Sequence, residues 1–228
     1  MKKLAIILSV ALGFFSFAQM AVADTISTLS QRGPYSWNNV GELTLLPLPL
    51  GGTLSSFVNS YDPRTRDFMQ EGTFQTFCLE AYEYLPLNAT YNAALNTKAV
   101  EGGVGPAGDP ISKGTAYLYY QFASGTLAGY DYADAINRTR WAEDLQKAFW
   151  ALEDEGGDIS AYQAMLIAKF GSIANAKLDN DGEYAVMALN VTKDGLNYQD
   201  VLIKTPEPFT LLLLGLGLLG VVGIRRKL

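Results

Sequence analysis

The chain has 228 residues and a formal net charge of −6, with no histidine and a single cysteine. The lack of histidine excludes a Ser-His-Asp triad, a histidine general base and nearly every zinc site. The acidic balance argues against nucleic acid and anionic lipid surfaces as partners. The sequence also shows no paired-carboxylate motif. The composition therefore favours a binding or structural protein over an enzyme, and it implies no cofactor.

The first residues have the pattern of a cleavable secretory signal. A charged start is followed by an apolar stretch over residues 4–17 and by the small-x-small site Ala21-Val22-Ala23. An uncleaved membrane helix is the alternative, which this cleavage site disfavours. We therefore expect residues 1–23 to be removed, with Ala21 and Ala23 flanking the site, as the chain is exported by the secretion machinery.

Short segments rich in β-forming residues follow the signal. They are residues 25–29, 41–46, 53–58 and 73–79. Turns such as Pro47-Leu48-Pro49 and Gly51-Gly52 separate them, which favours strands joined by tight connections. A segment rich in Gly and Pro, residues 101–110, predicts a loop.

The middle of the chain has helical periodicity. Apolar residues recur at helical spacing over 112–124 and 140–153, and glycine follows each segment. Ser160 and Gln163 form a capping box for a third helix over 160–170, which Gly171 would end. Segments 183–192 and 196–204 then flank Lys193-Asp194-Gly195, a pattern typical of a β-hairpin.

This order of strands, helices and a hairpin indicates an α+β fold. We expect a β-barrel or sandwich with an inserted helical subdomain packed at one end. We assign this extracytoplasmic domain to residues 24–204, which is long enough for one hydrophobic core.

The C-terminal segment, residues 205–228, differs from everything before it. Pro206-Glu207-Pro208 cannot continue a helix or a sheet ladder. Residues 209–224 carry no charge, and Arg225, Arg226 and Lys227 follow. As a helix the uncharged run spans about 24 Å, short of the roughly 30 Å of a bilayer core. We expect a marginal transmembrane helix with its basic end in the cytoplasm; an ordinary C-terminal anchor is the alternative.

The proline-flanked triplet, the Leu- and Gly-rich run and the basic end resemble, in this order, the PEP-CTERM sorting signal of Gram-negative bacteria. The resemblance implies recognition by an exosortase and cleavage near Pro206-Glu207-Pro208. It further implies transient anchoring in the inner membrane, then delivery to the outer surface or the extracellular matrix. It covers about a tenth of the chain.

Cys78 and Gln146 are the residues with the clearest chemical interest. Cys78 lies at the end of segment 73–79, and a lone cysteine cannot form an intramolecular disulfide in an exported protein. At about 100° per residue, Gln146 lies beside the core stripe of its helix, near Phe149 and Trp150. We therefore expect its amide to face an aromatic flank, where a buried amide needs a hydrogen-bonding partner.

Two strings resemble the paired signatures of bacterial thioester domains. Phe77-Cys78-Leu79 is similar to the aromatic-Cys motif on a strand, and Leu145-Gln146-Lys147-Ala148-Phe149-Trp150 is similar to the apolar-Gln-x-Ala-apolar-Trp motif on a helix. The resemblance spans residues 71–153. It implies a β-barrel with a helical subdomain, an internal thioester from the Cys78 sulfur to the Gln146 side chain, and packing by Trp150.

Two functions of different classes remain open from the sequence. The first is an adhesin that captures amines of a surface protein or exopolysaccharide through Cys78 and Gln146, supported by Phe77, Phe149 and Trp150. The second is a non-covalent structural or glycan-binding matrix protein in which Cys78 is an inert buried side chain. Glu80 and Glu83 are candidates to take the thiol proton in the first case.

Three further patterns have plainer interpretations. Asp179-Asn180-Asp181-Gly182-Glu183 is similar to part of a calcium loop but lacks the distal glutamate, so a solvated turn is the simpler interpretation. Residues 153–158 give an acidic loop. Five tyrosines could form a sugar-binding platform, although helical core packing explains most of them; they are Tyr117, Tyr119, Tyr120, Tyr130 and Tyr132.

Overall fold

The computed structural model describes residues 24–28, 36–37, 40–66, 71–101, 108–134 and 137–206. The predicted signal segment and everything after Pro206 lie outside these ranges. So do the predictions at Ala21, Ala23, Glu207, Pro208, Arg225, Arg226 and Lys227 and the uncharged run 209–224. Among the helices within the described ranges, none is long and apolar enough to cross a membrane.

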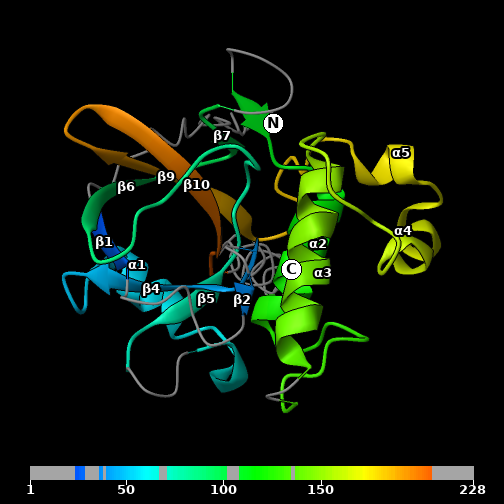
Figure 1. Cartoon of the computed structure of the whole chain (residues 1–228), viewed down its shortest axis with the longest axis horizontal. Coiled ribbons are helices and arrows are strands. Elements are labelled where there is room, and N and C mark those ends of the chain that lie inside the picture. Colours follow the sequence, from blue (N-terminus) through cyan, green and yellow to red (C-terminus); the bar gives the residue numbers. More distant parts are fainter. Residues whose placement is uncertain are drawn as a thin grey trace, which may run out of the picture.

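Six strands form one antiparallel sheet in the order β10-β9-β6-β1-β4-β5. The sheet curls into a half-barrel that occupies one side of the molecule (Figure 1). Its strands are β1 (Asp24–Thr28), β4 (Leu43–Leu48), β5 (Phe74–Thr76), β6 (Thr90–Asn96), β9 (Val186–Lys193) and β10 (Leu196–Lys204). Two short ribbons accompany it, β2 (Ser36–Trp37) with β3 (Val40–Gly41) and β7 (Lys98–Ala99) with β8 (Asp109–Pro110).

The two ends of this strand order approach each other just after β5. The Leu79 N–H donates to the Asp200 carbonyl at 3.0 Å, and the Leu202 N–H donates to the Phe77 carbonyl at 3.1 Å. Cys78 and Val201 form an antiparallel bridge between these two bonds. We call residues 77–79 together with 200–202 the seam, because this contact joins one edge of the curled sheet to the other.

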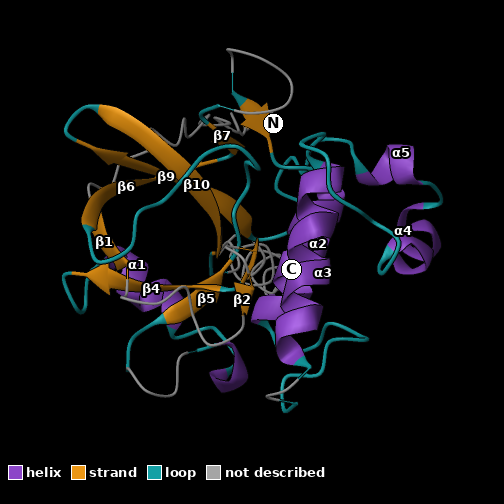
Figure 2. Cartoon of the chain, in the orientation of Figure 1, coloured by secondary structure: helices purple, strands orange, loops and turns teal. Residues whose placement is uncertain are grey.

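Helices follow β8 in the chain and cover the side of the sheet near the seam (Figure 2). The two long ones, α2 (Lys113–Ala123) and α3 (Arg138–Leu152), pack against each other. The shorter α4 (Gln163–Phe170) and α5 (Ile173–Ala176) lie on their far side. Buried aromatic rings join helices to seam: Phe77 lies 5.0 Å from Phe122 and 5.2 Å from Phe149, between ring centroids.

The structure confirms the β9–β10 hairpin and the mixed helix-and-sheet fold. At the hairpin tip Asp194 and Gly195 have φ of 53° and 78°, the positive values that a tight two-residue hairpin turn requires. The predicted end of α4 at Gly171 is also correct, since Gly171 takes the left-handed conformation with φ of 82°.

Two local predictions were wrong. Residues 53–58 form helix α1 (Thr53–Val58) rather than a strand. The Asp24 carboxylate accepts the Leu54 N–H at 2.9 Å and so satisfies an otherwise unpaired donor in its first turn. The capping box at Ser160 does not form, because the Ser160 N–H and hydroxyl both donate to Asp158; α4 begins only at Gln163.

Among the six strands of the sheet, β6 was missed altogether. β6 lies between β1 and β9 and so holds the middle of the sheet together. Its first residues alternate exposed and buried, with Tyr91 and Ala93 facing inward, but its Asn and Ala content gives it little intrinsic preference for a strand. A short 3₁₀ turn at Pro63–Thr65 completes the described elements.

Candidate functional site

The hydrogen bonds of the seam determine the direction in which the N–H and C=O groups of Cys78 point. Along a strand, the N–H and C=O groups of successive residues point to opposite sides. Phe77 and Leu79 use theirs to bond β10. The N–H and C=O of Cys78 therefore point away from β10, toward helix α3, where no neighbouring strand pairs with them.

The side-chain amide of Gln146 bonds these two backbone groups, as a neighbouring strand would do in a sheet. The Cys78 N–H donates to Gln146 Oε1 at 2.9 Å, and Gln146 Nε2 donates to the Cys78 carbonyl at 2.8 Å. Both residues are buried, with 2% of Cys78 and 1% of Gln146 exposed. The two motifs that the sequence singled out, 68 residues apart, therefore meet in one doubly hydrogen-bonded contact.

This contact has a definite chemical geometry. Oε1 and Nε2 bind the two backbone groups on either side of the Cys78 α-carbon, so the amide carbon between them is held opposite that α-carbon. The α-carbon carries the CH₂–SH group, and Cys78 is a buried thiol rather than half of a disulfide. The Gln146 amide and the residue that carries the thiol therefore lie next to each other in one buried contact.

Aromatic side chains hold the strand and the helix together around this contact. Phe77 packs edge-on against Phe149 on α3, and Tyr119 on α2 lies 6.3 Å from Phe149 between centroids. Phe77 and Phe149 are fully buried. Trp150 is half-buried, and its indole N–H is enclosed without a hydrogen-bond partner among the described residues. Of the predicted aromatic flank of Gln146, Phe149 is thus a residue of the hydrophobic core, whereas Trp150 is only half-buried.

The two carboxylates proposed to take the thiol proton differ. Glu80 is 3% exposed, and one of its oxygens accepts the Asp200 N–H at 2.9 Å. Burial, and next the nearby Asp200 carboxylate, raise the pKa of Glu80 to about 9. A carboxyl that keeps its proton at neutral pH is a proton donor, so Glu80 does not suit the role of base. Glu83 is only half-buried.

Asp200, a residue of the seam, is the second buried acid beside Glu80. Burial raises the pKa of Asp200 to about 6, although its carboxylate accepts hydrogen bonds from the N–H groups of Val100 and Val191 and from the Asn190 amide. Glu80 and Asp200 thus form a buried pair of acids directly beyond Cys78 and Leu79.

A second buried site was not found from the sequence. Arg138 at the start of α3 donates from Nε and Nη2 to the two oxygens of Glu42, at 2.8 and 2.9 Å. The Tyr130 hydroxyl also donates to Glu42. Arg138 is 3% and Glu42 0% exposed. The signal was present, since Glu42 is an acid beside the apolar run of β4, where an unpaired charge is costly.

The weaker sequence candidates have structural roles. Tyr119, Tyr130 and Tyr132 are buried in the core, so the five tyrosines do not form one surface platform. In the segment that is similar to part of a calcium loop, the Asn180 side chain donates to the Tyr184 carbonyl and accepts from the Tyr184 N–H. No group of three or more potential metal-ligating side chains is assembled within the described part of the chain.

Comparison with known proteins identifies one segment. The family model of the PEP-CTERM protein-sorting motif matches residues 204–227. No curated protein and no solved structure matches the chain. The matched segment starts at the last residue of β10, directly after the folded strands. The protein is therefore exported, transits the membrane and is processed by an exosortase.

Proposed function

We propose that this exosortase-sorted protein forms an internal thioester between Cys78 and Gln146 and uses it to capture amines covalently, at the outer surface or in the extracellular matrix. The observation that supports it is the double hydrogen bond that fixes the Gln146 amide against Cys78. The captured amine would belong to a partner surface protein or exopolysaccharide.

The first step exchanges one bond for another without any co-reactant. The Cys78 sulfur attacks the amide carbon of Gln146, the new S–C bond forms, the C–N bond breaks, and the thiol proton leaves with the nitrogen as ammonia. Contact between the sulfur and the amide carbon would contribute an effective molarity on the order of 10⁵ M or more. The Cys78 N–H already bonds Oε1 and would stabilise negative charge developing there.

The second step is the capture itself. An amine attacks the thioester carbon, an amide to Gln146 forms, and the Cys78 thiol is restored. Burial of the pair protects the thioester from water before that encounter. Because the reaction consumes the original amide, each molecule reacts once, and the protein is an adhesive cross-linker rather than an enzyme.

A non-covalent structural role for the same contact is the second candidate. Its support is that the Gln146 amide fully pairs the backbone of Cys78, which would otherwise present an unpaired N–H and C=O in the core. In this role Cys78 is an inert buried thiol and Gln146 is an anchor for α3.

Labelling with methylamine separates the two roles. The protein purified from the exporting cell is incubated with methylamine, digested and mapped by mass spectrometry. Amine capture predicts an adduct on Gln146 in the wild type and none in Cys78→Ala. Gln199 is the internal control, because it is also a buried amide paired with backbone, that of Glu80. Labelling of Gln146 that persists in Cys78→Ala, or that is absent from the wild type, would leave only the structural role.

A further inference from the structure

A pocket of about 380 Å³ lies at the start of β9, lined among others by Thr97, Ile111, Asp179, Asp181, Tyr184 and Thr205. Its volume falls within the range of small-molecule sites, roughly 300–1,000 Å³. The side chains come from the loop before β9, the end of β6, the end of β10 and the segment before α2. Neither Cys78 nor Gln146 lines it.

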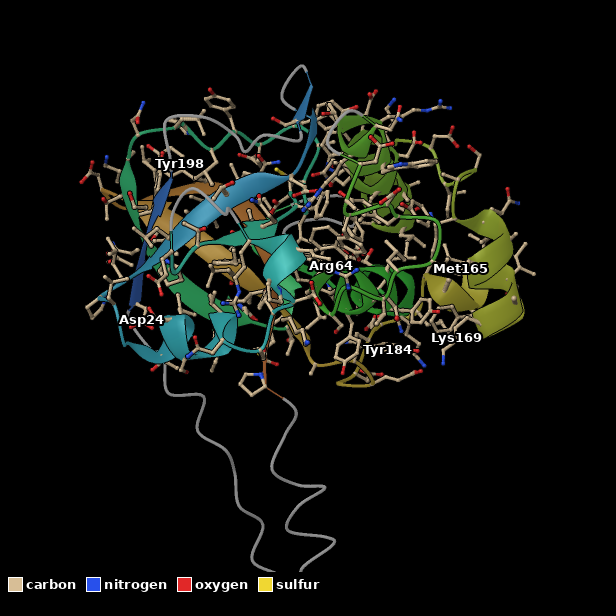
Figure 3. The ribbon with its side chains drawn as sticks, turned by 90° about the horizontal axis from the view of Figure 1, so that it is seen from below. Asp24, Arg64, Met165, Lys169, Tyr184 and Tyr198 are labelled. Carbon is tan, nitrogen blue, oxygen red and sulfur yellow. The ribbon has the colours of Figure 1, made fainter. Side chains whose placement is uncertain are left out.

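One wall of the pocket is apolar and fixed in position. The Tyr184 ring lies 5.5 Å from Tyr117 and 6.4 Å from Phe170, between centroids. The Lys169 ammonium lies 5.9 Å from the centre of the same ring, and Figure 3 shows the two side chains as neighbours at the edge of the molecule. Val186 and Met187 extend this wall along β9. A ligand would therefore meet a preformed aromatic and aliphatic surface.

The pocket lining also carries hydrogen-bond acceptors. Asp179 and Asp181 are exposed, and no side-chain hydrogen bond engages either carboxylate within the described residues. The Asn180 side chain between them is bonded to the Tyr184 backbone, so it holds the loop and leaves the flanking aspartates to face outward. Thr97 and Thr205 add hydroxyl groups.

No lysine or arginine is among the residues that line this pocket. Exposed carboxylates at its rim repel anions and accept hydrogen bonds from ligand hydroxyls. A pyranose ring matches both features of the pocket. Its hydroxyl groups can donate hydrogen bonds to the carboxylates, and its apolar C–H face can pack against an aromatic ring. We propose that this pocket binds a sugar unit of a neutral saccharide, with Asp179 and Asp181 accepting its hydroxyls and Tyr184 stacking on its face.

Saturation-transfer NMR on the purified exported protein tests this, with cellobiose, maltose and lactose as neutral probes and glucuronate as the anionic one. The expected result is transfer to at least one neutral disaccharide and weaker transfer to glucuronate. Because hydrogen bonds to charged groups are strong, Asp179→Ala and Asp181→Asn should each weaken binding about tenfold. Ala185→Phe, which fills the pocket without removing an acceptor, should abolish it.

The control for Asp181→Asn is Asp194→Asn at the hairpin tip. Both aspartates have positive φ, 45° and 53°, a conformation that asparagine also tolerates, so any backbone effect is matched. Absence of transfer to all three disaccharides overturns the proposal, and so does binding that the pocket variants leave unchanged. The pocket does not depend on the thioester, and repeating the titration in Cys78→Ala distinguishes the two: binding should persist there even if the thioester is absent.

Discussion

Helix α3 is attached to the sheet side of the molecule at two buried points, and the two use opposite physical means. At its first turn Arg138 makes a bidentate ion pair with Glu42; two turns later Gln146 makes a neutral double hydrogen bond with the backbone of Cys78. Both contacts are almost completely buried. The first joins two charged side chains, whereas the second joins a side chain to a main chain.

The two contacts differ in what the loss of one partner group would leave behind. A buried ion pair tolerates no loss of either partner, because the remaining charge has no solvent to stabilise it. The amide contact involves no charge, so the exchange of nitrogen for sulfur that we propose there would leave no buried charge without a partner. We therefore regard the Arg138–Glu42 pair as a structural anchor and the Gln146–Cys78 contact as the place where we propose that the thioester forms.

The largest effect is expected at the ion pair. Arg138→Met removes the partner of a buried carboxylate and should lower the free energy of unfolding by about 3–5 kcal/mol. Arg140→Met, at an exposed position one turn or less away, is the control and should change it little. Denaturant unfolding of both variants measures the difference. Equal effects of the two substitutions would show that the pair is not an anchor.

A smaller loss of stability is expected at the amide contact. Gln146→Ala removes both hydrogen bonds that its side chain makes to the buried backbone of Cys78, which should cost about 2 kcal/mol or more. The effect should appear equally in a Cys78→Ala background, because the lost hydrogen bonds are made to the backbone. Unfolding of the single and double variants measures it, with Gln163→Ala at an exposed position as the control. A loss that vanishes in the Cys78→Ala background would mean that the hydrogen bonds contribute nothing by themselves.

The last effect depends on pH and concerns the buried acids beside Cys78. Glu80, with a pKa raised from 4.5 to about 9, keeps a proton in the folded chain that the unfolded chain loses. Folding stability should therefore be highest near the lower pKa and fall as the pH rises toward about 9. Asp200, with its pKa raised to about 6, also makes folding stability fall as the pH rises, over a narrower pH range.

Glu80→Gln tests this assignment. The amide can still accept the Asp200 N–H but no longer titrates, so the thermal midpoint should fall less steeply between about pH 5 and pH 9 than in the wild type. Glu143→Gln, half-exposed on the surface of α3 and paired with Lys147, is the comparison. Parallel pH profiles for the wild type and Glu80→Gln would contradict a buried, protonated Glu80.

The sequence predicted the burial of Gln146 and the β9–β10 hairpin better than several of the elements around them. Helical periodicity placed Gln146 on a buried flank, and the hairpin signal at Asp194-Gly195 was correct, because both depend on local patterns. The strand assigned to 53–58 is helical, since Asp24, distant in sequence, bonds its first turn. The Glu42–Arg138 pair and the seam at Cys78 depend on which segments meet in space, which a local pattern does not encode.

The most direct test of the central claim is the intact mass of the protein purified from the exporting cell. If the Cys78 sulfur has displaced the Gln146 nitrogen, the wild type weighs one ammonia less than its sequence requires, and Cys78→Ala and Gln146→Ala weigh what theirs require. A wild-type mass equal to that of the unmodified chain, with the Cys78 thiol free to react with an alkylating agent after unfolding, would contradict it.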